Sequence, residues 1–164
     1  MNASNFKYKK NMPFTRRKYM GGVPGSKIVK FTMGNTSREY THRLELVNIK
    51  HVQIRHNALE AARIAANRVL EKNVGRENFM LKIVPFPHQI IREHKRVNVA
   101  QADRFQEGMK KAYGKPTAVA ARIRKNKPIM VAEVDKENIT HAREALKRAG
   151  AKFPSPSRIF VKPK

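Results

Sequence analysis

The chain carries a formal net charge of +24 on 164 residues, from 36 Lys and Arg against 12 Asp and Glu. Repulsion on this scale opposes a compact free chain and favours a polyanionic partner. The excess runs along the whole chain, with 11 cations against 2 acids in residues 1–50, 9 against 4 in residues 51–100 and 16 against 6 in residues 101–164. A membrane-surface protein more often concentrates its charge in one amphipathic helix or one polybasic tail. The distribution therefore favours a protein embedded among nucleic-acid phosphates.

The rest of the composition limits the fold and the compartment. A length of 164 residues suits one domain with an extended arm, and a hydrophobic content of 40% is enough for a core. The absence of cysteine excludes disulfides, thiolate zinc sites and cysteine nucleophiles. No apolar run approaches the roughly 20 residues of a membrane span, and the first residues lack the apolar stretch of a signal peptide. We therefore expect a cytoplasmic protein.

Residues 1–43 show no sustained helical or strand periodicity, and we interpret them as an extended basic arm. Cations and aromatic residues are interleaved there, and a glycine-rich stretch follows at residues 21–27. Small residues let a backbone approach closely, and cations with aromatics suit threading along RNA. The alternative is a flexible basic terminus without specific contacts. A phosphate-binding loop is rejected, because that motif needs Gly-Lys-Ser/Thr opening a helix and the order here is Gly25-Ser26-Lys27.

Residues 44–164 are predicted to form a single α+β domain of mixed or antiparallel sheet with two main helices. The first helix is predicted to have Asn57 as N-cap and to end at Gly75. Its buried stripe is predicted to be Leu59, Ala62, Ala66 and Val69 or Leu70. The second helix is predicted to follow Asp135 as N-cap and to end at Gly150. Its inward-facing residues are predicted to be Ile139, Ala142, Leu146 and Ala149.

Apolar runs with the period of a strand fill the intervals around these helices. Residues 44–55 form two short strands or one bulged strand, because the apolar phase slips within them. The remaining predicted strands are residues 79–84, 89–92, 118–123, 129–134 and 157–162. A basic turn at residues 124–128 joins two of them. Residues 94–116 are only weakly periodic, and they are predicted to form a long internal loop.

No group of residues indicates catalysis or metal binding. The pairs His51 with His56 and His88 with His94 have no carboxylate cluster beside them, whereas zinc and non-haem iron need converging ligands. We expect ordinary hydrogen-bonding or RNA-stacking histidines. The twelve acids are scattered singly and fit pairing with bases on helix faces, and no Gly-x-Ser-x-Gly elbow occurs. The sequence therefore predicts no enzyme, no cofactor and no metal site.

Four motifs, in order along the chain, resemble one protein family. The sharpest is residues 102–116, ADRFQEGMKKAYGKP. The others are residues 15–19 leading into residues 22–27; residues 53–56 with Leu59-Glu60-Ala61 and Ala66-Asn67-Arg68; and Phe86-Pro87-His88-Gln89. Residues 142–146 also look like the last helix of that family. Over nearly its whole length the chain resembles the archaeal and eukaryotic large-subunit ribosomal protein family L ten-e, the relative of bacterial ribosomal protein L sixteen.

The resemblance implies a structural constituent of the large ribosomal subunit, located in the cytoplasm. It implies binding to large-subunit rRNA near the peptidyl-transferase centre and A-site tRNA, with a loop at about residues 94–114 directed towards the tRNA acceptor arms. The expected partners are large-subunit rRNA, the vicinity of 5S rRNA, A-site or P-site tRNA and neighbouring ribosomal proteins. No membrane and no homo-oligomer is expected. Lys110 and Ala118 depart from the family's usual residues, which are an arginine and a glycine or serine.

Phosphate contacts are expected to dominate binding. The predicted rRNA-binding residues are Arg16, Arg17, Lys18, Lys27, Arg55, Arg63, Arg68, Lys82, His88, Arg92, Lys95, Arg96, Arg122, Arg124, Lys125 and Lys127. The predicted tRNA-proximal loop contributes Arg104, Lys110, Lys111 and Lys115. Two other classes stay open. A general, chromatin-like nucleic-acid-binding protein would also bind duplex DNA, and an RNA-processing enzyme would need acids or nucleophiles that converge in one pocket.

Overall fold

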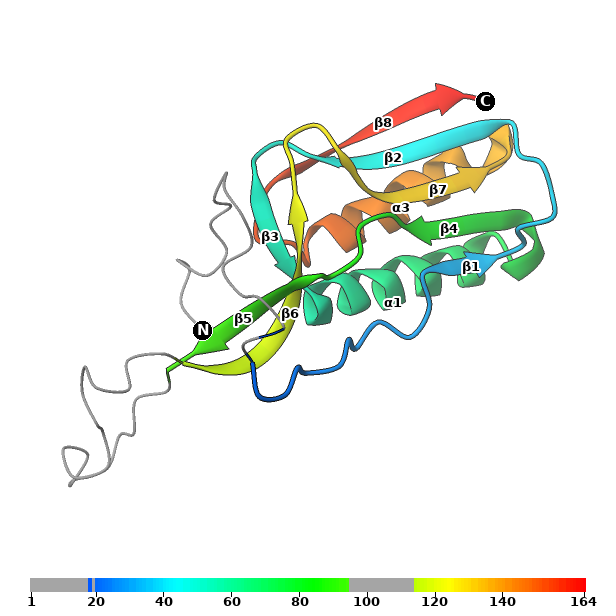
Figure 1. Cartoon of the computed structure of the whole chain (residues 1–164). Coiled ribbons are helices and arrows are strands. Elements are labelled where there is room, and N and C mark those ends of the chain that lie inside the picture. The colour runs from blue at the N-terminus through cyan, green and yellow to red at the C-terminus, as the bar shows by residue number, and fades with distance from the viewer. Residues whose placement is uncertain (1–17, 19, 95–113) are drawn as a thin grey trace, which may run out of the picture.

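A five-stranded sheet with two helices on one face forms the larger part of the molecule, and a three-stranded sheet extends from one end of it (Figure 1). The computed structural model describes residues 18, 20–94 and 114–164. The elements are β1 (Thr32–Gly34), β2 (His42–Asn48), β3 (Val52–Arg55), α1 (His56–Asn73), η3 (Arg76–Asn78), β4 (Phe79–Ile83), β5 (Gln89–Glu93), β6 (Lys115–Ile123), β7 (Pro128–Val134), η5 (Lys136–Asn138), α3 (Ile139–Gly150) and β8 (Ser157–Pro163). This arrangement confirms the predicted α+β class.

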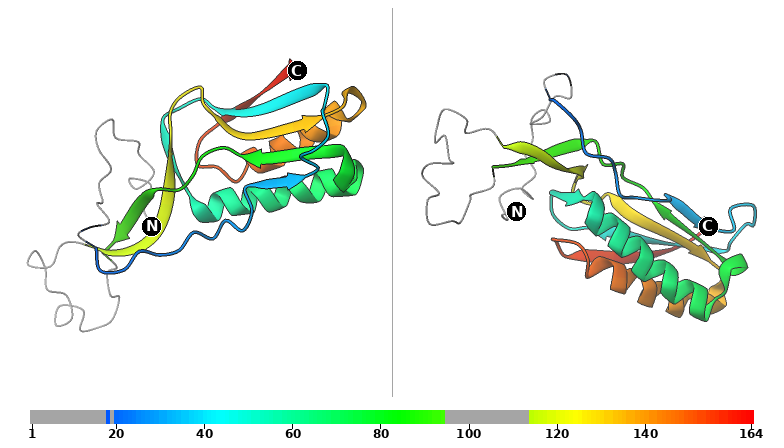
Figure 2. Two further views of the ribbon diagram at one scale, coloured as in Figure 1. Left: turned by 45° about the vertical axis from the view of Figure 1, so that its right-hand side comes forward. Right: turned by 90° about the horizontal axis from the view of Figure 1, so that it is seen from below.

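The main core lies between the five-stranded sheet and the helices. The strand order is β1-β4-β7-β2-β8, and every neighbouring pair is antiparallel. Phe79, Leu81 and Ile83 of β4 are buried, whereas Lys82 between them is exposed, as the alternating pattern predicts. Seen from below, α1 and α3 lie side by side along the sheet (Figure 2). Each fully buried side chain of this kind stabilises the fold by about 1.5–3 kcal/mol, so the two layers depend on one another.

The three-stranded sheet has the order β3-β6-β5 and shares the same core through one face. Val52 and Ile54 of β3 lie opposite Ile123 and Ala121 of β6, and all four side chains belong to the core. β2 and β3 are separate strands in different sheets. The slip in the apolar phase therefore marks the point where the chain changes sheet, which confirms the prediction of two short strands.

Two other connections also carry the chain from one sheet to the other. The turn between β6 and β7 contains Asn126 with φ +61°, and the N–H of Asn126 donates to the Asn48 carbonyl at 2.9 Å. Pro85 and Pro87 lie in the connection from β4 to β5, where no ladder needs the N–H that proline lacks. At these two connections the consecutive strands belong to different sheets, so they do not form hairpins.

α1 begins at His56, directly after β3, and the prediction of an Asn57 cap is wrong. Arg55 holds the N-cap position with extended backbone, and no side chain caps the helix. The helix is started by the strand before it and by burial of His56 rather than by a cap. The predicted buried stripe is confirmed. Gly75, at φ +83°, ends the helix and donates its N–H to the Leu70 carbonyl at 3.1 Å.

α3 begins later than predicted. Asp135 precedes the short helix η5 and does not cap it, because its carboxylate accepts a hydrogen bond from Arg38 at 2.7 Å. The α-helix then starts at Ile139, which is half-buried, and ends at Gly150. The predicted inward residues Ala142, Leu146 and Ala149 are fully buried.

The C-terminal part of the predicted arm packs on the domain. β1 pairs with β4, and Ile28, Met33 and Tyr40 are buried. Gly34 has φ +82°, and a Cβ on it would lie 2.1 Å from the Phe79 carbonyl oxygen. Residues 1–17 and 19 of the predicted arm, and residues 95–113 of the predicted loop, lie outside the described residues.

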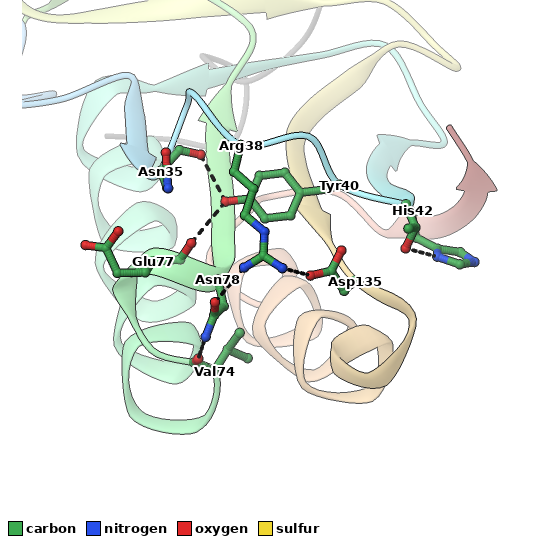
Figure 3. Close-up of polar contacts among 9 residues, drawn as sticks. Asn35, Arg38, Tyr40, His42, Val74, Glu77, Asn78 and Asp135 are labelled. Atoms are coloured by element: carbon green, nitrogen blue, oxygen red, sulfur yellow. Dashed lines mark hydrogen bonds and ion pairs between the residues drawn. The ribbon is translucent and has the colours of Figure 1, made fainter.

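A polar network fastens the loop between β1 and β2 to η3 and to the residue before η5 (Figure 3). Arg38 donates to Asn78 Oδ1 and to Asp135 Oδ2, both at 2.7 Å, and its guanidinium lies 5.7 Å from the centre of the Tyr40 ring. The Tyr40 hydroxyl donates to the Asn35 carbonyl at 3.0 Å, and burial raises the pKa of Tyr40. These contacts fix the end of the molecule that lies away from the three-stranded sheet.

Candidate nucleic-acid interface

The two ends of the molecule differ in charge. We call the end with the three-stranded sheet the basic end; it comprises residues 48–57, 84–94 and 114–129, with eight Lys or Arg and one acid, Glu93. The opposite end, called here the balanced end, comprises residues 32–45, 71–79, 133–140 and 161–164, with seven cations and seven acids. A uniform basic composition therefore folds into one strongly positive end, which is where a polyanion is attracted.

The turn between β6 and β7 carries part of this charge on a fixed backbone. Its three exposed cations are Arg124, Lys125 and Lys127. Among the described residues, none of these side chains forms an ion pair. The Lys125 N–H donates to His51 Nδ1 at 3.3 Å, and the Lys127 carbonyl accepts from the Asn48 N–H at 3.4 Å. The backbone of the turn is thus held against the β2–β3 connection, with its three cationic side chains exposed.

The three-stranded sheet adds a polar strip on the face away from the core. Sheet alternation puts Gln53 beside Arg122, and Arg55 beside Ala120, on this face. Gln89 of β5 also lies opposite Ala120 and is only 3% exposed. Arg55 and Arg122 are half-buried. Gln53 is only 4% exposed, so on this face the two guanidinium groups, and not the amides, reach the surface.

The predicted internal loop leaves and re-enters the sheet through a tight stem. Glu93 of β5 lies opposite Lys115 of β6, so the last two residues of the predicted loop belong to a strand. A Cβ on Gly114 would lie 2.4 Å from the carbonyl carbon of Glu93, so only glycine fits there. Arg92 and Lys115 are exposed at this stem. The two strands that flank residues 95–113 therefore end at the basic end.

Near α1, the predicted contacts differ in exposure. Lys27 and Arg68 are exposed. The Arg63 side chain is only 14% exposed, and it donates to both carboxylate oxygens of Glu60, at 2.9 and 2.6 Å. These hydrogen bonds from Arg63 lower the pKa of Glu60. Arg63, predicted as an rRNA contact, is thus paired with a bidentate partner one turn away and is largely buried.

His56 docks the glycine-rich segment onto the start of α1. Its imidazole is 3% exposed, and Nδ1 accepts from the Lys27 N–H at 3.1 Å. Burial, together with the charges of Lys27 and Arg55, lowers the pKa of His56. His56 is therefore a neutral, hydrogen-bonding histidine, one of the two roles expected from the sequence.

At the balanced end three of the seven acids, Glu45, Glu133 and Asp135, form ion pairs within the fold. Glu45 pairs with Arg43 at 3.0 Å and with Lys162 at 2.9 Å, and Glu133 pairs with Lys164 at 2.9 Å. The hydrogen bond from Lys162 lowers the pKa of Glu45. The cations here serve the fold itself, whereas those of the basic turn remain available to a partner.

An aromatic cluster that was not predicted from the sequence lies beside the connection from β4 to β5. The Phe31 and Phe86 rings are stacked, with centroids 5.5 Å apart and planes 19° apart. The His88 ring lies 4.7 Å from Phe86, tilted by 48°. His88 and Lys82, both predicted rRNA contacts, are exposed. The spacing of Phe86 and His88 could have drawn attention to this pair, but nothing in the sequence links them to Phe31.

The remaining predicted contacts divide between described and undescribed residues. Lys18 is described and exposed. Seven lie outside the described residues, namely Arg16, Arg17, Lys95, Arg96, Arg104, Lys110 and Lys111. Among residues 18, 20–94 and 114–164, no three side chains of His, Asp or Glu gather as metal ligands. Neither helix in this part of the chain is long and apolar enough to span a bilayer.

Comparison with known proteins identifies the family. The family model described as ribosomal protein L16p/L10e matches residues 4–160. The chain belongs to this family. Staphylothermus marinus has an L16p/L10e relative that is 52% identical over 151 residues, covering 92% of this chain and 87% of the relative. The relative in Methanosphaerula palustris is 47% identical over 148 residues, covering 90% and 86%, and that in Hyperthermus butylicus is 45% identical over 151 residues, covering 92% and 84%.

All three relatives are named large ribosomal subunit protein uL16. Membership of the L16p/L10e family confirms the resemblance that the four motifs indicated. It also makes the chain a ribosomal protein and not an enzyme, so the RNA-processing alternative is set aside.

Proposed function

We propose that this L16p/L10e protein is a structural constituent of the large ribosomal subunit and binds large-subunit rRNA through its basic end. The charge difference between the two ends carries the proposal. Eight cations face one acid at the basic end, and none of the exposed side chains of the basic turn is paired with an acid within the described residues. Each phosphate that such a cation neutralises releases a counterion, which drives binding. The names of the relatives support the large subunit as its location.

The proposal extends to the position of the protein within the subunit. We infer contact with rRNA near the peptidyl-transferase centre and A-site tRNA, with the 5S rRNA in the vicinity. The family motif at residues 102–116 supports this position. The stem at Glu93 and Lys115 supports it as well, because the loop that carries the motif starts from the basic end. A loop on a rigid scaffold is where contacts with a moving ligand such as tRNA are usually placed.

The test removes three positive charges from the basic end and compares rRNA binding with that of a variant that lacks three positive charges outside the basic end. The first variant is Arg124→Ala, Lys125→Ala and Lys127→Ala. The control is Lys136→Ala, Lys147→Ala and Lys152→Ala, which removes three exposed lysines of η5, α3 and the turn after α3. Both variants lose the same net charge. Binding to large-subunit rRNA is measured across a range of salt concentrations, with duplex DNA as competitor.

We expect the turn variant to lose at least about tenfold in affinity at moderate salt. Its logarithmic salt slope should become shallower by about two, because each lost phosphate contact accounts for roughly 0.7–0.9. The control should match the parent protein in both quantities. Equal losses in the two variants would show that net charge alone drives binding. Equally tight binding to duplex DNA would favour the general nucleic-acid-binding alternative.

A further inference from the structure

The aromatic cluster of Phe31, Phe86 and His88 is partly exposed, so packing in the core does not account for it. Phe31 is half-buried and packs against the core, so it anchors the stack. Phe86 is 49% exposed and His88 is also exposed. Val29 and Val84 beside them are 74% and 46% exposed. Exposed rings and aliphatic side chains that are close in the chain, on a small and highly charged protein, indicate a site of contact with a partner.

The backbone around the cluster is held in place. The Phe31 carbonyl accepts from the Ile83 N–H at 2.8 Å, and the Val84 N–H donates to the Ile129 carbonyl at 3.0 Å. Pro85 and Pro87 flank Phe86 and fix their own φ angles. The rings therefore have little freedom to collapse onto the core or to separate. A ligand that stacks on them meets a preformed surface and loses little binding energy to ordering it.

The charges around the rings indicate the chemistry of that ligand. These hydrogen bonds bring together residues 27–32, 82–89 and 124–131, which contain six Lys or Arg and no acid. One carboxylate reaches them, since Glu60 accepts from the Val29 N–H at 3.4 Å, but Arg63 neutralises it. An apolar protein partner does not need a rim of cations. A nucleotide presents a flat base and an anionic phosphate together, and it matches both features.

We propose that an unpaired base of the rRNA stacks on Phe86 and His88 and continues the row of rings that begins at Phe31. Lys82 and the cations of the basic turn then hold the phosphates that flank this base. The inference rests on the proposed function, and it adds one defined nucleotide contact to a general electrostatic surface. Because every base has a π-face, any of the four bases can stack here. The site therefore selects an unpaired base by its location in the folded rRNA and not by its identity.

The test replaces one ring and keeps the apolar surface. Phe86→Leu removes the stacking partner but leaves an aliphatic side chain, and Phe86→Trp restores an aromatic face. Phe160→Leu is the matched control, because Phe160 on β8 is 47% exposed and outside the cluster. Each variant is rebound to large subunits from which this protein has been stripped with salt. Affinity, salt slope and ultraviolet crosslinks mapped by mass spectrometry are then measured, and thermal melting checks folding.

Phe86→Leu should lose at least about fivefold in affinity with an unchanged salt slope, since stacking is lost and phosphate contacts remain. Phe86→Trp and Phe160→Leu should bind as the parent does, and the parent should form a nucleotide crosslink on Phe86 or His88. Unchanged affinity in Phe86→Leu, or a crosslink from this cluster to a protein, would overturn the inference. If the basic-turn variant still weakens binding in that case, the proposed function stands without the stacked base. If the parent protein fails to rebind, both proposals fall.

Discussion

Gly34 leaves no room for a side chain, because its α-carbon packs against the Phe79 carbonyl where β1 meets β4. We expect Gly34→Ala to lower the free energy of unfolding by more than about 2 kcal/mol. An alanine there would combine a left-handed backbone, at φ +82°, with a Cβ 2.1 Å from a carbonyl oxygen. Chemical denaturation of the purified protein measures the loss.

Gly75 provides the matched control for this substitution. It has nearly the same φ, +83°, but the nearest atom to its would-be Cβ is 4.0 Å away. Gly75→Ala should therefore cost the conformational part alone, about 1–3 kcal/mol and less than Gly34→Ala, because φ +83° with ψ 148° is a conformation that essentially only glycine adopts. Equal losses at the two positions would show that β1 shifts away from β4 at little cost, and that the close approach at Gly34 does not constrain the sheet.

At the scale of elements, His56 joins the glycine-rich segment to α1, and its protonation state sets the strength of that joint. Burial lowers its folded pKa below the usual 6.5, so the unfolded chain binds the proton more tightly. The contribution of His56 to stability is therefore complete above about pH 6.5. It is lost as the pH falls through the lowered pKa, by at most about 1.4 kcal/mol per pH unit.

The measurement is urea unfolding between pH 8 and pH 5. His56→Gln keeps an acceptor for the Lys27 N–H and does not titrate, so its stability should be flat in this window. Glu45 and Glu60 have lowered pKa values and titrate below this range. A parent protein with flat stability from pH 7 to pH 5 would contradict this role of His56.

The elements that the sequence predicts are those whose periodicity is repeated often enough to be seen. The stripe of α1 and the alternation in β4 are each set by burial on one face, so pattern and structure agree. β1 has only three residues, too few to show a period of two. The predicted start of the second helix was wrong for a related reason. The Asp135 carboxylate could accept from helix N–H groups or from Arg38, and it accepts from Arg38, which is distant in the sequence.

The candidate interface shows the same limit. Exposure of Lys82 follows from strand alternation, and it was predicted. The inward position of Arg63 depends on Glu60 three residues earlier, a spacing that does signal a pair on a helix. The stack of Phe31 on Phe86 joins two segments that meet only because β1 and β4 are neighbours. Contacts within one turn can be inferred from a sequence, but contacts across a sheet need the pairing of its strands.

At the scale of the whole molecule, folding separates charges that the sequence distributes evenly. Each third of the chain is basic, yet the acids with known partners at the balanced end, Glu45, Glu133 and Asp135, are neutralised there by nearby cations. The basic end keeps eight cations against one acid. The folded molecule is therefore polar in charge although its sequence is not. One end is strongly positive and attracts polyanions, and the other end is close to neutral.

Residues 97–112, between the two strands of the stem, allow anchoring to be tested separately from function. Replacing residues 97–112 with a Gly/Ser linker of the same length should leave the core folded, because the stem at Glu93, Gly114 and Lys115 stays in place. The variant should still join large subunits through the basic end. Translation by those subunits should slow, because the proposed contact of the loop with tRNA is lost.

Sedimentation of reconstituted subunits measures incorporation, and peptide synthesis by the purified subunits measures function. A second linker that keeps Arg104, Lys110 and Lys111 at their positions is the control for charge. If it restores the rate, the loop acts through its cations, and if it does not, the loop acts through its shape. Subunits that carry the plain linker at full occupancy and translate at the parent's rate would show that this segment is a solvated insertion. The role of the protein would then lie entirely in its rRNA contacts.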